Sequence, residues 1–371
     1  MKSVSTFLGA ATALLTLTTA LPVAARNDDA EGGVGSYDLH NLVSDGSATA
    51  DHTDTNLVNA WGIAFNPTGP VWISDNGTNL STLYDGAGNI VPLVVSIPGP
   101  ANSAEGAAPT GIVWSASSGF VVTEGALKGP SRFIFATEQG TIAGWAPSVA
   151  FTHAITAVDN SASRAIYKGL ALSAGGSGNL LYATDFHNRR IDVFDSAFAP
   201  VQVSGGFADP MIPQNFAPFG IQAINGDIYV TYAQQDADRV DDVHGRGLGY
   251  VDVYDPNGNL LQRVAVRGFL NAPWGLALAP AGFGQFAGRL LVGNFGDGRI
   301  HAFDAATGRW VGALTGSDRR WLQIDGLWGL SFGNGFAGQQ IDSLYFTAGP
   351  GDEEHGVYGR ITATPGRKGM H

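Results

Sequence analysis

The sequence predicts an all-β protein: a six-bladed β-propeller with four-stranded blades, its ring closed by the N-terminal strand joining the last blade. The first observation is a set of six glycines that begin apolar strands at spacings of 49, 58, 51, 55 and 54 residues. A repeat of this length without an amphipathic helical window is typical of propeller blades. The six glycines are Gly62, Gly111, Gly169, Gly220, Gly275 and Gly329.

The second observation is that the outer halves of the repeats align. In three repeats the polar residue ending the second strand and the aspartate ending the third are ten positions apart: Asp75 and Asp85, Asp185 and Asp195, and Asn294 and Asp304. The third observation is that the last repeat stops after its third strand, whereas the strand pattern at 37–45 has no hairpin partner. Pairing the two would close the ring and remove open sheet edges.

The domain boundaries follow from these repeats. Residues 37–363 are predicted to form one propeller domain, preceded by a flexible lead at 26–36 and followed by a C-terminal tail at 364–371. Residues 1–25 have one lysine, an apolar run and small residues at Val23 and Ala25, which is the pattern of a signal peptide. We therefore expect a secreted or periplasmic protein. Neither this run nor any later segment reaches the ~20 apolar residues of a membrane-spanning helix.

The composition narrows the partners. Of 371 residues, 44% are hydrophobic and 14% charged, the formal net charge is −12, and cysteine is absent. Disulfides, thiolate metal sites and cysteine nucleophiles are thereby excluded. An acidic surface repels phosphate backbones, which argues against nucleic acid. We expect a small molecule, a glycan or a protein partner, with a cationic ligand or a divalent metal favoured by charge, and a monomeric chain.

Several motifs resemble known propellers. The segments LYATDFHNRRIDVFD and VGNFGDGRIHAFD, each with an acid or amide, a turn and an Arg-Ile pair, are similar to NHL repeats. The chain also resembles a family of exported bacterial propellers that has no established activity. This resemblance is carried by the motifs NAWGIAF, FIFATEQGTIAGW, DDVHGRGLG and IDGLWGL. The resemblance spans residues 37–363 and implies the fold. It implies little about chemistry, because propellers include lyases, lactonases and pure binding proteins.

Propeller geometry gathers the candidate site residues. The loops before the first strands and the turns between second and third strands share one face, here called the top face. Acidic residues concentrate on it, including those of two long insertions at 234–249 and 349–356. The candidate ligand-binding residues there are Asn59, Trp61, Asp75, Glu138, Asp185, Tyr232, Trp274, Asn294, Trp328 and His355.

A divalent cation is one interpretation of these acids. Calcium prefers several oxygen ligands, and the candidate metal ligands are Glu138, Asp185, Asp241, Asp242 and His244. The favoured alternative is that Asp75, Asp185 and Asn294 accept hydrogen bonds within their own turns, because the same residue type recurs once per blade. Three loop histidines, His187, His244 and His355, lack any zinc-binding spacing.

An aromatic residue recurs before the glycine in four of six repeats, at Trp61, Phe219, Trp274 and Trp328. These rings either line a ligand funnel or, as we favour, wedge between adjacent blades. The functional hypothesis is an exported propeller that binds a ligand or partner protein at its acidic top face without catalysis. The alternative is a divalent-metal-assisted hydrolase, lactonase or lyase acting on a small ester, lactone or glycan at the channel mouth. No catalytic residue is identified, and the sequence leaves open whether the protein is an enzyme.

Overall fold

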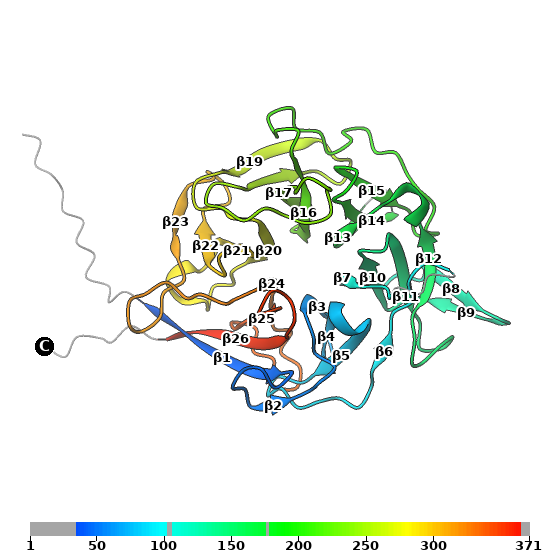
Figure 1. The fold of residues 1–371 in the computed structure, drawn as a ribbon, viewed down its shortest axis with the longest axis horizontal. Helices are drawn as coiled ribbons and strands as arrows, with labels where there is room; N and C mark the ends of the chain where they lie inside the picture. Colours follow the sequence, from blue (N-terminus) through cyan, green and yellow to red (C-terminus); the bar gives the residue numbers. More distant parts are fainter. Residues whose placement is uncertain (1–34, 102–105, 176–177, 365–371) are drawn as a thin grey trace, which may run out of the picture.

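The computed structural model describes residues 35–101, 106–175 and 178–364, and arranges them as six small antiparallel sheets around a central axis (Figure 1). The predicted signal peptide lies outside the described residues, as do most of the predicted lead and tail. The described part contains no α-helix, only three short 3₁₀ turns, η1 (Asn76–Thr78), η2 (Ser161–Ser163) and η3 (Gly284–Phe286). Within it, no helix has the length and apolarity to cross a membrane. The predicted six-bladed, all-β architecture is confirmed.

The first three blades, numbered in chain order, follow the repeats. Blade 1 contains β3 (Ala60–Phe65), β4 (Val71–Asp75), β5 (Leu80–Tyr84) and β6 (Val95–Ser96). Blade 2 contains β7 (Pro109–Trp114), β10 (Phe133–Thr137), β11 (Thr141–Trp145) and β12 (Ile155–Asp159), and its hairpin β8 (Val121–Glu124) and β9 (Leu127–Pro130) projects at the rim (Figure 1). Blade 3 contains β13 (Tyr167–Gly175), β14 (Gly178–Asp185) and β15 (Arg190–Phe194), with a single bridge from Phe194 to Pro200 where a fourth strand would pair.

The other three blades carry the insertions and the closure. Blade 4 contains β16 (Phe216–Ile224), β17 (Asp227–Gln234), β18 (Tyr250–Tyr254) and β19 (Leu260–Val266). Blade 5 contains β20 (Pro273–Leu278), β21 (Leu290–Asn294), β22 (Ile300–Phe303) and β23 (Trp310–Ala313). Blade 6 contains β24 (Leu327–Phe332), β25 (Leu344–Ala348), β26 (Val357–Thr364) and β1 (Ser36–Ser44), with the short β2 (His52–Thr53) at its edge.

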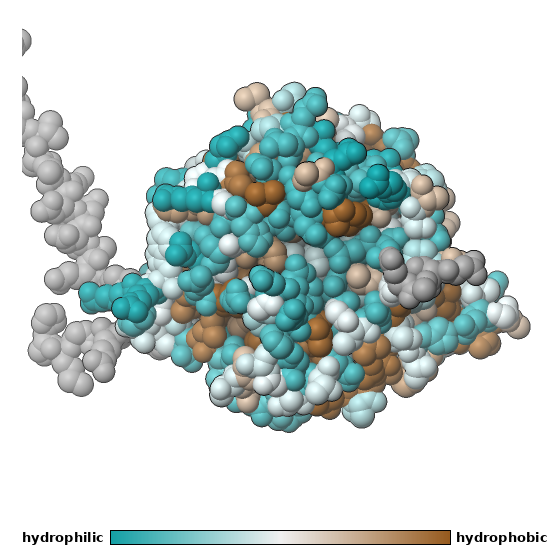
Figure 2. Space-filling view, viewed as in Figure 1, coloured by the Kyte–Doolittle hydropathy of each residue, from teal (hydrophilic) through white to brown (hydrophobic). Residues whose placement is uncertain are grey.

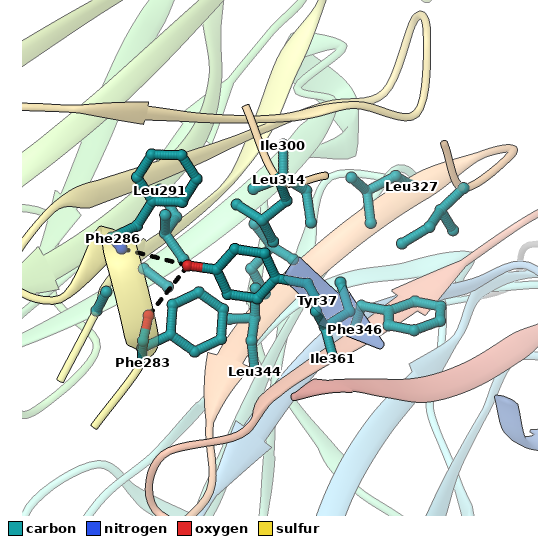
Figure 3. Close-up of a cluster of buried hydrophobic side chains, with 14 of the residues drawn as sticks. Tyr37, Phe283, Phe286, Leu291, Ile300, Leu314, Leu327, Leu344, Phe346 and Ile361 are labelled. Carbon is teal, nitrogen blue, oxygen red and sulfur yellow. Dashed lines mark hydrogen bonds between the residues drawn. The ribbon is translucent and has the colours of Figure 1, made fainter. Parts of the chain in front are cut away.

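The ring is closed by β1, as the sequence predicts. This strand runs antiparallel to β26, with Tyr37 opposite Ala363 and Ser44 opposite Val357. Tyr37 also ties the closing strand to blade 5 (Figure 3), because its hydroxyl donates to the carbonyl of Phe283 at 3.1 Å and accepts from the amide of Phe286 at 3.2 Å. The Tyr37 ring lies among buried side chains of blades 5 and 6. The N-terminal strand is therefore held by packing as well as by its sheet.

The six marker glycines have a common structural cause. A Cβ atom added to Gly329 would lie 2.8 Å from the carbonyl oxygen of Trp61, and one added to Gly275 would lie 2.5 Å from that of Trp328. The same contact, from each glycine to the backbone of the next inner strand, recurs around the whole ring at Gly62, Gly111, Gly169 and Gly220. Each inner strand approaches its neighbour so closely that a side chain does not fit there.

The aromatic–glycine pairs sit in irregular strands. The inner strand register shifts between Ala60 and Ile63, between Pro218 and Ile221, between Pro273 and Leu276, and between Leu327 and Leu330. Each shift brackets one aromatic residue and its glycine. A bulge bends a strand and changes where its side chain points, and here it marks the segment that supplies a ring to the axis.

Candidate functional site

An aromatic cluster closes the channel at the top face. The indole of Trp328 is stacked between Trp61, with ring centroids 3.7 Å apart, and Phe295, at 3.8 Å. Trp274 meets Trp61 edge-on at 6.4 Å, and Phe219 meets Trp328 at 5.8 Å. Phe186 of blade 3 completes this axial aromatic cluster through its contact with Phe219. The two stacked contacts join neighbouring blades, 6 with 1 and 5 with 6, as in the favoured interpretation, whereas the edge-on contacts of Trp274 with Trp61 and of Phe219 with Trp328 join blades that are not neighbours.

The channel below the axial aromatic cluster is narrow. A cavity of about 20 Å³ lies between the inner strands, bounded by residues such as Gly62, Leu170 and Leu330. A single water molecule needs about 10–15 Å³ of such space. The channel therefore has room for about one water molecule, and the axial aromatic cluster forms a floor across its upper end.

Lys168 lies on this floor. Its side chain is only 2% exposed, and its ammonium lies 5.2 Å from the centroid of the Trp61 ring. The ammonium donates to the carboxylate of Glu138 and, at 2.9 Å, to Oδ1 of Asp241. Burial by itself lowers the pKa of Lys168, but the Glu138 and Asp241 carboxylates outweigh burial and hold this pKa above its ordinary value. Lys168 is therefore a permanent buried cation.

A directional chain of hydrogen bonds runs from blade 6 to this cation. The indole Nε1 of Trp328 donates to Oδ1 of Asn59 at 3.0 Å, which directs the Asn59 amide toward Oδ1 of Asn76 at 3.2 Å and Oε2 of Glu353 at 2.6 Å. The amide of Asn76 in turn donates to Oε2 of Glu138 at 2.9 Å. An indole N–H only donates, so it fixes the orientation of both amides. The chain orients Glu138 toward Lys168.

Glu353 belongs to the loop between β25 and β26, which lies over the ring near its axis (Figure 1). Burial raises the pKa of Glu353 to about 7, with a further contribution from the Glu138 carboxylate, against opposing effects of Lys168 and the Asn59 amide. Its backbone has a φ of 68°, and that of Asp352 a φ of 54°, both in the left-handed region that non-glycine residues rarely adopt. The loop thus holds a carboxyl group that changes charge near neutral pH.

These groups border a cavity of about 520 Å³, here called the mouth pocket. Its volume lies within the ~300–1,000 Å³ typical of small-molecule sites. Four carboxyl groups from blades 2, 4 and 6 line it, together with residues of blade 3. The lining residues used below are Glu138, Arg164, His187, Asp241, Asp352 and Glu353. The top face around the axis is predominantly hydrophilic, with separate apolar patches rather than one continuous apolar surface (Figure 2).

Three predicted polar residues sit inside their own blades. Asp185 accepts from the amides of Ile166 at 3.3 Å and Asn188 at 3.2 Å, and Asn294 accepts from the amide of Asn271 at 3.1 Å. Both are fully buried and make the hydrogen bonds of the structural alternative. Asp75 is also fully buried and accepts from the Thr82 hydroxyl at 3.2 Å. Burial raises its pKa well above the ordinary value.

Two further predicted residues lie away from the mouth pocket. Tyr232 hydrogen-bonds Tyr254 at 2.6 Å and borders a separate cavity of about 350 Å³ formed by blades 3 and 4. Strand alternation explains this position, because the next residue, Ala233, packs in the axial aromatic cluster while Tyr232 points to the opposite face. His355 is half-exposed, and its Nδ1 lies 2.9 Å from Oδ2 of Asp45 at the end of β1.

The five predicted metal ligands do not converge on one point. Glu138 and Asp241 flank Lys168, whereas Asp185 is committed to its own turn. His244 lies 3.2 Å from Oδ2 of Asp242, and this contact raises the pKa of the histidine. Within residues 35–101, 106–175 and 178–364, no group of three or more histidine or acidic side chains has a metal-binding arrangement. The charge between Glu138 and Asp241 is supplied by an ammonium.

Sequence reasoning missed the central residue of this site. Lys168 immediately precedes Gly169, the position that holds Trp61, Phe219, Trp274 and Trp328 in four other repeats. A lysine at a repeat position that otherwise faces a buried axis is a detectable signal, because a buried lysine needs acidic partners. Arg164 carries no comparable signal, since it lies in a loop outside the repeat, whereas Asp352 and Glu353 belong to the 349–356 insertion, whose acids the sequence places on the top face.

The fold and this geometry define a six-bladed propeller whose candidate site is a pocket at one mouth of its ring. The chain belongs to the same family as two uncharacterised proteins of Acanthamoeba polyphaga mimivirus, R648 and L690. It is 33% identical to R648 over 335 residues, which cover 88% of this chain and 80% of R648. It is 32% identical to L690 over 335 residues, covering 88% of this chain and 86% of L690. No protein-family model matches the chain.

Solved structures agree with the fold. A structural-genomics protein of unknown function from Bacteroides thetaiotaomicron is 11% identical, with a TM-score of 0.56, over 89% of this chain and 76% of its own. A glucose dehydrogenase is 14% identical, with a TM-score of 0.53, over 88% of this chain and all of its own. At such low identity the likeness extends to the fold alone. The relatives named above are viral, so membership of the NHL-repeat or exported bacterial propellers stays a prediction.

Proposed function

We propose that the protein binds a small cationic ligand, such as a primary amine or a guanidinium compound, in the mouth pocket. The observation that carries this proposal is the pocket's charge. Glu138, Asp241, Asp352 and Glu353 line it, and among the described pocket and floor residues their charge is opposed by the cations Lys168 and Arg164. Because Lys168 is buried behind Glu138 and Asp241, the carboxyl groups of the β25–β26 loop remain for a ligand.

The aromatic floor supports the same proposal. Lys168 joins this floor to the pocket through its ion pairs with the lining residues Glu138 and Asp241, and a cation held near an aromatic face gains attraction from the ring. Lys168 already makes such a contact with Trp61. A small amine bound in the pocket would take a carboxylate of Asp352 or Glu353 as its partner.

Thermal-shift measurements test the proposal. The chain is heated with ethanolamine, cadaverine or agmatine, with the neutral pentanediol, and with the anionic glutarate. We expect a concentration-dependent rise in melting temperature for the amines alone. Parallel samples with calcium and with a chelator test the predicted divalent cation. A rise in melting temperature with calcium would favour a metal site over an amine site.

Matched variants assign the effect to the pocket. Combining Asp352→Asn with Glu353→Gln should abolish the amine response, whereas Glu354→Gln, which changes an exposed acid of the same loop, should preserve it. An amine response that survives the double variant would contradict the proposal, and so would equal stabilisation by pentanediol.

The second candidate function is the hydrolase or lyase acting on a small ester, lactone or glycan. One observation favours it: Glu353 has a pKa of about 7, and general acid–base groups work best when their pKa lies near the working pH. Assays with lactone and ester panels, with and without calcium, would show turnover that Glu353→Gln abolishes. Turnover that Glu353→Gln leaves unchanged would remove Glu353 from this role.

We also propose that the chain is exported, on the strength of the N-terminal pattern at 1–25. Expression of the full chain in a bacterial host with a periplasm, followed by intact-mass measurement, tests this directly. Cleavage after Ala25 is the expected result. An uncleaved cytoplasmic product would contradict it.

A further inference from the structure

The repeats of blades 3 and 5 differ at one charged position. In blade 3, Asp192 lies three residues before Asp195, and its Oδ1 accepts from Nε of Arg190 at 2.7 Å. The equivalent residues of blade 5 are His301 and Arg299, counted back from Asp304. The acid that neutralises the arginine in one blade is therefore a histidine in the other.

His301 is a neutral hydrogen-bond donor. It is 1% exposed, and its Nδ1 accepts from the indole Nε1 of Trp310 at 3.3 Å. Burial lowers the pKa of His301 to about 4, so the ring is uncharged at neutral pH. A neutral ring that accepts at Nδ1 carries its proton on Nε2. The Nε2–H is buried and has no partner among the described residues.

Arg299 also has a buried hydrogen-bond donor without an acceptor among the described residues. Its Nε is also buried and has no hydrogen-bond partner in the described part of the chain. Arg299 and His301 are two residues apart at β22, so their side chains share one face of the sheet. Buried donors without acceptors cost free energy, and two of them in one place indicate that an acceptor is supplied from outside.

Both residues border a cavity of about 90 Å³, here called the blade-5 pocket, which is lined by Arg246, Phe269, Asp297, Arg299, His301 and Trp321. Its walls are flat rings, with Phe269 5.5 Å from His301 and Trp321 5.7 Å from His301 between centroids. The guanidinium of Arg246 lies 4.8 Å from the Phe269 ring and that of Arg299 5.2 Å from the Trp321 ring. A guanidinium over a ring keeps its edge N–H groups free to bind an anion.

Asp297 does not supply the missing hydrogen-bond acceptor for Arg299 Nε. Its Oδ1 accepts from the Asn294 amide at 3.1 Å and from the backbone amide of Arg299 at 3.3 Å, which commits the carboxylate to its own turn. Its Oδ2 lies 3.8 Å from a terminal nitrogen of Arg299, beyond hydrogen-bond distance. Although an acid is near, the Arg299 Nε has no acceptor among the residues that the structure describes.

We propose that the blade-5 pocket binds the carboxylate group of a small ligand, which accepts hydrogen bonds from Arg299 Nε and His301 Nε2 while Arg246 supplies a second positive charge. The flat aromatic walls favour a planar carboxylate over a tetrahedral anion. The cavity is large enough for a carboxylate group, and the rest of the ligand extends past the partly exposed Trp321. This site shares no lining residue with the mouth pocket and does not depend on the function proposed there.

Tryptophan fluorescence tests the proposal, because Trp310 and Trp321 adjoin the pocket. The chain is titrated at constant ionic strength with propionate, with the neutral propionamide and with inorganic phosphate. We expect a saturable change with propionate alone. No saturable change, an equal change with propionamide, or an equal affinity for phosphate would overturn the carboxylate assignment.

Variants locate the effect. His301→Asp rebuilds the internal acid of blade 3, and it should weaken propionate binding at least ten-fold without unfolding the chain. Arg299→Gln, at a partly exposed side chain, should do the same and serves if the buried substitution fails to fold. Arg190→Gln removes the blade-3 arginine that already has Asp192 and should leave binding unchanged. Binding that survives both blade-5 variants, or is lost in Arg190→Gln, would overturn the proposal.

Discussion

At the level of single residues, Lys168 is the residue around which the side chains at the mouth of the ring are arranged. It is buried between two carboxylates on an aromatic floor, and the hydrogen-bond chain from Trp328 through Asn59 and Asn76 orients one of them. A buried ion pair contributes little net stability when intact, but removing one partner leaves an uncompensated charge. The lysine therefore specifies the geometry of the pocket more than it stabilises the fold.

Replacing Lys168 with methionine should lower the free energy of unfolding by about 3 kcal/mol, because Glu138 would lose its buried partner. Urea denaturation measures this loss, and Lys128→Met, at an exposed lysine, is the control. Adding Glu138→Gln to Lys168→Met should recover part of the loss. Equal stability of the Lys168 and Lys128 variants would mean that the ion pair is not formed.

Glu353 gives the protein a specific pH dependence. Its pKa of about 7 in the folded chain exceeds the ordinary 4.5, so the folded state binds the proton more tightly. The stability linked to this group is present below pH 4.5 and is lost as the pH rises through 7, by about 3 kcal/mol. Denaturation of wild type and Glu353→Gln at several pH values isolates the effect, and the variant should lack this loss. Parallel pH profiles would contradict the assignment.

Prediction of single residues from the sequence succeeded where the repeat determines where a side chain points. It failed where the alternation of side chains along a strand turns a residue to the other face. Trp61, Trp274 and Trp328 reach the axis because each precedes a ring-contact glycine within a bulge. Tyr232 lies two residues before the end of β17, yet its side chain faces the neighbouring blade. The contacts between Glu353, Asn59 and Glu138 join residues far apart in the sequence, and no local pattern encodes such contacts.

The ring-contact glycines show how individual elements fit together. Each inner strand lies so close to the next that the glycine carries the contact, which explains why glycines mark the repeat better than any other residue. A side chain at Gly329 would meet the Trp61 carbonyl oxygen at 2.8 Å, at the junction between the last and first blades.

Gly329→Ala should therefore destabilise the protein by at least about 2 kcal/mol, because the junction would have to open. The control is Gly35→Ala, whose added Cβ would find its nearest neighbour at 3.8 Å. Thermal and urea denaturation of both variants check the difference. A Gly329→Ala protein as stable as the control would mean that the inner strands are further apart than described.

The closing strand β1 depends on Tyr37 in the same way. Tyr37→Phe keeps the ring but leaves the Phe283 carbonyl and the Phe286 amide without their partner, at a cost of about 1–3 kcal/mol. Tyr229→Phe is the matched control, since no hydrogen bond of the Tyr229 hydroxyl is found within the described residues. Equal stability of the two variants would show that the hydrogen bonds of the Tyr37 hydroxyl contribute nothing to the stability of the protein.

For the whole molecule, the sequence predicts the fold far better than the site. The period, the turns and the orphan first strand determine the number of blades and their closure, because these features repeat. The mouth pocket is built from the exceptions to the repeat: a lysine in an aromatic position and two insertions of unequal length. Propellers with the same ring differ in such exceptions, so the fold alone does not give the ligand.

The most direct test of the account is the proton released when a cation binds the mouth pocket. A cationic ligand favours the ionised form of Glu353, whose pKa is about 7. Titration calorimetry of cadaverine at pH 7, in two buffers of different ionisation enthalpy, measures this release. The account predicts about half a proton released per ligand in the wild type, and none in Glu353→Gln. Binding without proton release, or the same release from both proteins, would contradict it.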